Sequence, residues 1–138
     1  MPRTKAPRSQ PLIAVNDVLA SSVWYAKLLN VRLHSDTEED THGNSYNRLS
    51  KGNQIIMQLH GWDADGHPNM ISKTDTVVGH GVVLWFEVDE FNETVSRAKE
   101  IGAISLEEPS KKPYAHHLEF WIADPNGYVV GIASKPEL

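Results

Sequence analysis

The sequence predicts an α+β fold made of two tandem modules, each with the order strand, helix and three strands. Apolar periodicity and turn residues produce this order twice, and Val15-Asn16-Asp17 occupies the same place in the first series as Val88-Asp89-Glu90 in the second. A single module, with one helix and one sheet, cannot form a closed apolar core by itself. The two modules are therefore expected to pack together as one compact domain of 138 residues.

The first predicted module covers residues 10–60. The short apolar run 12–15 is typical of a buried strand, and Asn16-Asp17 then offers a cap for a helix over 18–29, where apolar residues recur at helical spacing. Residues 54–60 alternate between two faces, which indicates a strand. Further strands are expected at 31–34 and 45–50.

The second predicted module covers residues 82–134, after a linker over 61–81 that lacks apolar periodicity. Residues 1–9 carry charges and prolines and are expected to form a loose tail. In the second module, strands are expected at 82–88, 104–106, 117–122 and 128–133, a helix at 91–101, and a proline-containing loop at 107–114.

Composition and charge argue against several classes of function. The chain has no cysteine, which excludes a disulfide framework, a cysteine-rich zinc module and a thiol nucleophile. Its net charge of -5 argues against a nucleic-acid-binding protein, because phosphates attract basic surfaces. No apolar run is long enough for a membrane span or a secretory signal. We therefore expect a cytoplasmic protein with no membrane or nucleic-acid partner.

Three segments resemble the vicinal oxygen chelate superfamily, which includes glyoxalase I, extradiol dioxygenases, and fosfomycin- and bleomycin-resistance proteins. They are 15–30, with a Val-Asn-Asp start and an aromatic helix, 86–103, with Val-Asp-Glu and Gly-Ala, and 119–128, with the turn Asp-Pro-Asn-Gly. The resemblance implies that the paired βαβββ modules form a half-open, barrel-like cleft. It also implies a homodimer and a small-molecule ligand.

The resemblance also identifies the positions where metal-dependent members hold a divalent cation. Residue by residue, these positions fall on Gln10, Gln58, Val83 and Gly131, with Met57 replacing Gln58 if the alignment slips by one. Two neutral amides, a valine and a glycine offer a cation few suitable donors. We therefore expect no metal of the family type and no other cofactor, which makes the bleomycin-resistance branch the nearest in pattern.

Strand alternation predicts which side chains point into the cleft that the resemblance implies. In one strand, the face opposite the apolar side chains carries Trp85 and Glu87. In another strand, the corresponding face carries His117, Glu119 and Trp121. Tryptophan walls with a few polar groups suit a flat or amphipathic small molecule. These tryptophans could equally be core or dimer-contact residues. The candidate ligand-binding residues are Tyr46, Arg48, Gln58, His60, Trp85, Glu87, His117, Glu119 and Trp121.

Three functional hypotheses follow. The first is a metal-free binding protein, similar to bleomycin-resistance proteins, that encloses an aromatic or cationic ligand in the tryptophan-lined cleft. The second is a metal-dependent lyase or dioxygenase with rearranged ligands, for example His60, His117 and Glu119. The third is a structural or regulatory dimer whose own side chains fill the cleft. Trp62, in the linker, could act as a lid or as a dimer contact.

Overall fold

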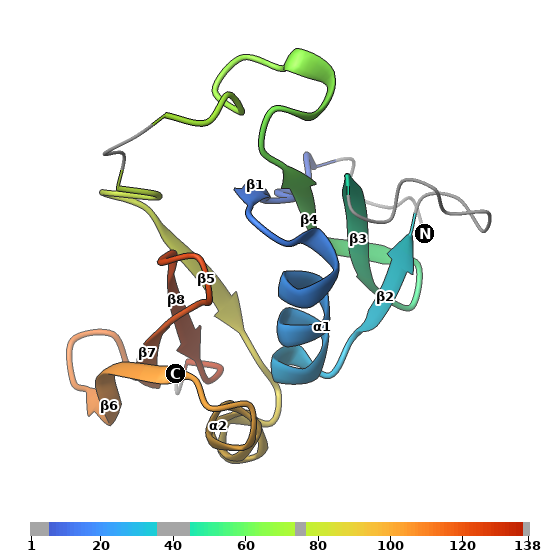
Figure 1. Cartoon of the computed structure of the whole chain (residues 1–138). Coiled ribbons are helices and arrows are strands. Elements are labelled where there is room, and N and C mark those ends of the chain that lie inside the picture. Colours follow the sequence, from blue (N-terminus) through green and yellow to red (C-terminus); the bar gives the residue numbers. More distant parts are fainter. Residues whose placement is uncertain (1–5, 36–44, 74–76, 137–138) are drawn as a thin grey trace.

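The computed structural model describes residues 6–35, 45–73 and 77–136, and within them the predicted order of elements occurs twice (Figure 1). Residues 6–9 of the predicted tail have no regular secondary structure, and residues 1–5 lie outside the described part of the chain. In the described residues, no helix combines the length and the apolar character needed to cross a membrane.

The first module forms a four-stranded sheet with the strand order β1-β4-β3-β2. Its helix begins after Asp17, whose side chain accepts a hydrogen bond from the Ala20 backbone N–H at 2.9 Å, and ends at Asn30 in a left-handed conformation. The predicted cap and helix bounds are therefore confirmed. The elements are β1 Leu12–Val15, α1 Val18–Leu29, β2 Arg32–Ser35, β3 Tyr46–Lys51 and β4 Gln54–Gly61.

The second module repeats this arrangement with the strand order β5-β8-β7-β6. One expectation was wrong: the predicted loop from Glu107 is strand as far as Lys112, although it contains Pro109. The strand tolerates this proline because it lies at the edge of the sheet and pairs irregularly with its neighbour. The elements are β5 Val83–Glu87, α2 Phe91–Glu100, β6 Ile104–Lys112, β7 His117–Ala123 and β8 Val129–Ala133.

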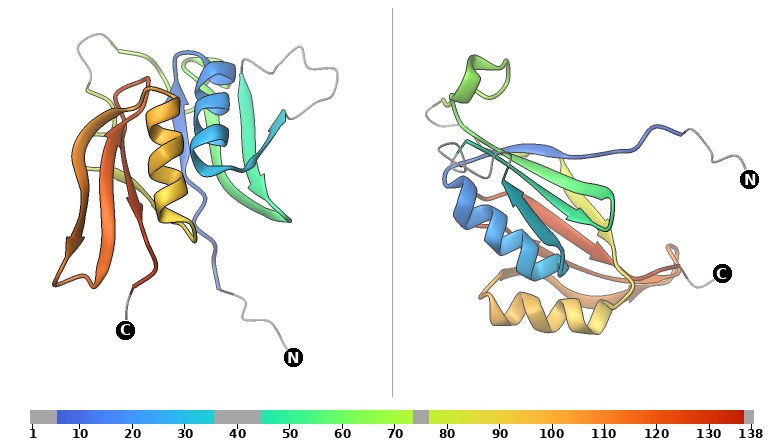
Figure 2. Two further views of the ribbon diagram at one scale, coloured as in Figure 1. Left: turned by 90° about the horizontal axis from the view of Figure 1, so that it is seen from below. Right: turned by 90° about the vertical axis from the view of Figure 1, so that its right-hand side faces the viewer.

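The two helices lie side by side, with one sheet on either side of the pair (Figure 2, left). The Arg97 side chain of α2 donates a hydrogen bond to the Leu28 carbonyl of α1 at 3.0 Å. The apolar side chains that the sheets turn toward the helices, such as Met57 and Phe120, belong to a single core that spans both modules. The opposite faces of the two sheets therefore remain available for polar and aromatic side chains.

The turn between β7 and β8 fastens the second module to the first. The Tyr25 hydroxyl on α1 donates to the Asp124 carboxylate at 2.6 Å, and both residues are buried. The Asn16 backbone N–H donates to the Asn126 side chain at 3.0 Å, and the Tyr128 hydroxyl donates to a β1 carbonyl at 2.8 Å. The pKa of Tyr25 is raised well above its ordinary value of 10.0. Burial is the largest cause, and the negative charge of Asp124 is the second.

Candidate functional site

The outer face of the second sheet carries a group of four side chains, which we call the tryptophan cluster: Trp85, His117, Glu119 and Trp121. The Trp85 and Trp121 rings meet edge to face, with centroids 6.3 Å apart and planes at 83°. The His117 ring lies 5.8 Å from Trp85, also edge to face. Trp85 is 44% exposed, so its ring presents a surface that a ligand can contact.

Glu119 is the buried charge in this cluster. It is only 7% exposed, and burying a carboxylate costs free energy unless hydrogen bonds satisfy its oxygens. His117 Nε2 lies 2.8 Å from one carboxylate oxygen, and the Trp121 indole N–H donates to the other at 2.6 Å. The carboxylate thus orients one wall of the cluster, and the exposed Glu87 on the same strand as Trp85 adds a second negative charge.

The remaining four predicted residues gather on the first sheet. The Tyr46 hydroxyl donates to the Gln58 side-chain oxygen at 2.5 Å, and the Tyr46 and His60 rings lie 6.1 Å apart. Arg48 is the register partner of Gln58 on the neighbouring strand. The structure therefore brings the nine predicted residues together in two groups, one on each sheet.

A groove of about 1010 Å³, which the sequence did not predict, lies beside strands β1 and β5. None of the nine predicted residues, all within the described ranges, lines it. Trp62 does line it, which is compatible with either of the roles considered for this residue. A second cavity of about 510 Å³ includes Glu87. Prominent among the residues that line the groove are Leu12, Ala14, Trp62, Met70, Val82 and Tyr128.

The positions that the resemblance assigns to metal ligands are Gln10, Gln58, Val83 and Gly131, and in this chain they are a poor fit for a divalent cation. Val83 offers no donor atom. At Gly131, a Cβ would lie 2.6 Å from Trp85 Cε3, far closer than carbon atoms normally approach. Trp85 therefore fills the space that a ligand side chain at position 131 would need. Gln58, at a third position, uses its side-chain oxygen to accept the Tyr46 hydrogen bond.

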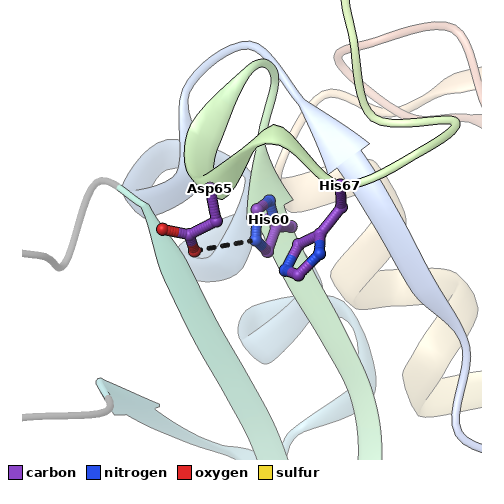
Figure 3. A group of neighbouring side chains, drawn as sticks. All are labelled: His60, Asp65 and His67. Atoms are coloured by element: carbon purple, nitrogen blue, oxygen red, sulfur yellow. Dashed lines mark ion pairs between the residues drawn. The ribbon is translucent and has the colours of Figure 1, made fainter.

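Within the described residues, His60, His117 and Glu119 do not form a group with metal-ligand spacing. His60 lies instead with Asp65 and His67, whose ligand atoms are within 4.8 Å of one another (Figure 3). Sequence reasoning missed this group because strand and helix periodicity does not show that His67, an exposed residue of the turn after β4, returns beside His60. The close spacing of the three residues in the sequence was the available signal.

Two tandem βαβββ modules with unclosed sheets define this chain as a paired-module α+β protein. A model of the Glyoxalase/Bleomycin resistance protein/Dioxygenase superfamily matches residues 9–132, and the chain belongs to this superfamily. No curated protein matches the sequence.

Solved structures support the same fold at low sequence identity. One is a glyoxalase/bleomycin resistance protein/dioxygenase family enzyme from Burkholderia phytofirmans PsJN, with 21% identity, a TM-score of 0.69, and coverage of 91% of this chain and 96% of that chain. TioX from Micromonospora sp. ML1 has 16% identity, a TM-score of 0.68 and coverage of 92% and 98%. Lactoylglutathione lyase from Agrobacterium tumefaciens has 16% identity, a TM-score of 0.64 and coverage of 95% of each chain.

Proposed function

We infer that this protein binds a small aromatic or cationic molecule against the tryptophan cluster, without a metal of the family type. The observation that carries this proposal is the pair of nearly perpendicular tryptophan rings, one of which, Trp121, donates a hydrogen bond to a buried carboxylate on the polar face of a sheet. Aromatic rings fixed at right angles offer both a stacking face and an edge to a flat ligand. Membership of the Glyoxalase/Bleomycin resistance protein/Dioxygenase superfamily is compatible with such a role.

Two carboxylates, those of Glu119 and Glu87, would attract a cation to the cluster. His117 and Trp121 hold the Glu119 carboxylate at the cluster by one hydrogen bond to each oxygen. Tryptophan faces attract cations through the ring quadrupole, by about 0.5–2 kcal/mol. A planar aromatic cation would use both features of the cluster, the flat rings and the negative charge.

The proposal of metal independence rests on position 131. Because Trp85 packs against Gly131, the aromatic wall and a family-type ligand at that position exclude each other. The aromatic surface of the cluster is thus built in the place where metal-dependent relatives carry a ligand. If ligand binding proves to require a divalent cation, the metal-dependent lyase or dioxygenase hypothesis replaces this one.

Calorimetric titration tests the proposal with a matched pair of probes, the cation N-methylacridinium and neutral acridine, both in the presence of a chelator. We expect the cation to bind more tightly than the neutral probe. Trp85→Ala should weaken its binding by about 5- to 30-fold, since the exposed ring can be removed without opening the core. Glu87→Gln should reduce the preference for the cation.

Glu93→Gln is the matched control, because it removes an exposed carboxylate from α2 on the other side of the sheet. It should leave the binding of both probes unchanged. The proposal fails if neither probe binds, or if Trp85→Ala binds N-methylacridinium as well as the wild-type protein does.

We also propose that the protein is a homodimer. Within the described residues, strands β1 and β5 each pair with one neighbour, so both present an open edge beside the groove. The apolar side chains of Leu12, Ile71, Val77 and Val82 are exposed there, and such patches mark interaction surfaces.

Light scattering coupled to size exclusion should give twice the chain mass for the wild-type protein and a smaller value for Leu12→Lys. A monomeric wild-type protein would contradict the proposal.

A further inference from the structure

The end of β4 and the turn that follows it bring two histidines and one carboxylate together. His60, Asp65 and His67 contribute ligand atoms that all lie within 4.8 Å of one another, and Figure 3 shows the three side chains gathered at the end of the strand. We propose that this group binds one divalent transition-metal ion of the zinc class, at a site separate from the strand positions used by metal-dependent members of the superfamily.

His60 already has the arrangement of a metal-ligating histidine. Its ring is buried, at 4% exposure, and its Nδ1 lies 2.8 Å from the Gly61 carbonyl oxygen. A carbonyl only accepts hydrogen bonds, so Nδ1 carries the proton and Nε2 of the neutral ring has a free lone pair. Metal-ligating histidines commonly donate their second ring nitrogen to a backbone carbonyl in this way, which fixes both the tautomer and the ring orientation.

The spacing between the donor atoms suits a shared ion better than a direct contact. His60 Nε2 lies 3.6 Å from the nearer Asp65 carboxylate oxygen, which is too long for a hydrogen bond. Two ligand atoms bound to one tetrahedral zinc ion at about 2.0–2.1 Å lie roughly 3.3 Å apart. A contraction of about 0.3 Å therefore brings this pair to the separation that coordination requires.

The turn that presents Asp65 and His67 is held by its own hydrogen bonds. Ser72 donates to both carboxylate oxygens of Asp63, through its backbone N–H at 2.9 Å and its hydroxyl at 2.7 Å. The His67 carbonyl accepts from the Met70 N–H at 3.1 Å, and the Asp63 N–H donates to the Met70 carbonyl at 2.7 Å. The backbone of the turn is thus ordered before any ion arrives, so binding need not order a free loop.

The donor set determines which ions fit. Two imidazoles and one carboxylate suit zinc, nickel, cobalt and iron(II), whereas calcium and magnesium prefer a full set of oxygen ligands. Three protein ligands leave at least one coordination position open for water or another small ligand. Because Trp62 and Met70 of the same turn line the groove, an ion here would fix one wall of that groove to the end of β4.

Metal titration of the full-length, chelator-treated protein tests the proposal, with zinc followed by calorimetry and cobalt followed by its visible absorption. We expect one ion per chain. His67→Ala and Asp65→Asn change exposed side chains and should leave the fold intact, and each should weaken zinc binding by at least about 10- to 100-fold. His60→Gln, at the buried position, should do the same if the variant folds.

His80→Ala is the matched control, since His80 is exposed on the same linker and lies outside the group. It should bind zinc with the affinity of the wild-type protein. The proposal is overturned if the wild-type protein takes up no stoichiometric zinc or cobalt, or if His67→Ala and Asp65→Asn bind as tightly as the control. The second result would leave the three side chains as close neighbours that do not share an ion.

Discussion

Gly131→Ala adds a single methyl group directly against the tryptophan cluster. The new Cβ would lie 2.6 Å from Trp85 Cε3 and 3.2 Å from Val83 Cγ1, whereas carbon atoms in good contact are about 3.5–4.0 Å apart. The Trp85 ring must therefore move by about 1 Å, or strands β5 and β8 must separate. Because the ring is half-exposed, we expect the ring rather than the strands to move.

The expected loss of unfolding free energy is about 1 kcal/mol, at the low end of the range of about 1–3 kcal/mol for overpacked sites. The ring would lose its edge contacts with Trp121 and His117 as it swings outward. Urea denaturation measures the stability, and near-ultraviolet circular dichroism reports the coupling between the two indoles. The affinity for N-methylacridinium should fall in parallel with that coupling.

The same substitution in a Trp85→Ala background supplies the control. With the indole removed, an alanine at position 131 meets no ring, and replacing a strand glycine should then stabilise the protein by about 0.5–1 kcal/mol. The sign of the effect should therefore reverse between the two backgrounds. Equal destabilisation in both backgrounds would refute the reasoning, since the cost could not then arise from contact with Trp85.

Three further predictions concern the fold and the turn after β4. Tyr25→Phe should lower the unfolding free energy in urea by about 1.5–3 kcal/mol, because the buried Asp124 carboxylate loses a donor. The raised pKa of Tyr25 means that wild-type stability should decline as the pH rises above about 10, and this contribution should be missing in Tyr25→Phe. Asp17→Ala removes the cap of α1 and should cost about 1 kcal/mol in thermal denaturation. The hydroxyl and backbone N–H of Ser72 lower the pKa of Asp63, so Ser72→Ala should raise it toward 3.8 in a carboxylate NMR titration.

For each of these predictions, one outcome would contradict the reasoning. Equal urea stability of Tyr25→Phe and the wild-type protein would show that Asp124 does not depend on the tyrosine hydroxyl. Thermal stability of Asp17→Ala equal to that of the wild-type protein would show that the Asp17 cap does not stabilise α1. An unchanged Asp63 titration in Ser72→Ala would mean that the hydroxyl does not hold the carboxylate.

Local pattern was enough to predict most of the fold. Alternation on β5 placed Leu84 and Phe86 in the core and Trp85 on the opposite face, and the structure shows exposures of 6%, 9% and 44%. The repeated order of elements and the bounds of α1 followed from periodicity and a single capping aspartate. These features depend on neighbouring residues, so a single sequence contains the information needed to predict them.

Features that depend on distant contacts could not be predicted in this way. The extension of β6 through Pro109 requires knowing that the strand lies at the edge of its sheet. Local alternation also could not show that the nine candidate residues are divided between the two sheets. The relative placement of the sheets depends on buried pairs such as Tyr25 and Asp124, which are far apart in the chain.

The turn of Asp65 and His67 was missed for a different reason. Asp65 has a backbone φ of 60°, a left-handed conformation that residues other than glycine rarely adopt, and strand periodicity gives no indication of it. This conformation belongs to the turn that carries Asp65 and His67 back beside His60. Spacing along a regular strand or helix therefore could not identify the group.

The hydrogen bond from Tyr128 to the Ala14 carbonyl joins residues that are 114 positions apart. Closing so long a loop costs chain entropy, so we expect the junction between the modules to form late in folding. This hydrogen bond also makes the two repeats interdependent, because neither half contains its own partner for it. Despite its duplicated pattern, the protein should unfold in a single cooperative transition, and a fragment ending before β5 should not hold a stable structure.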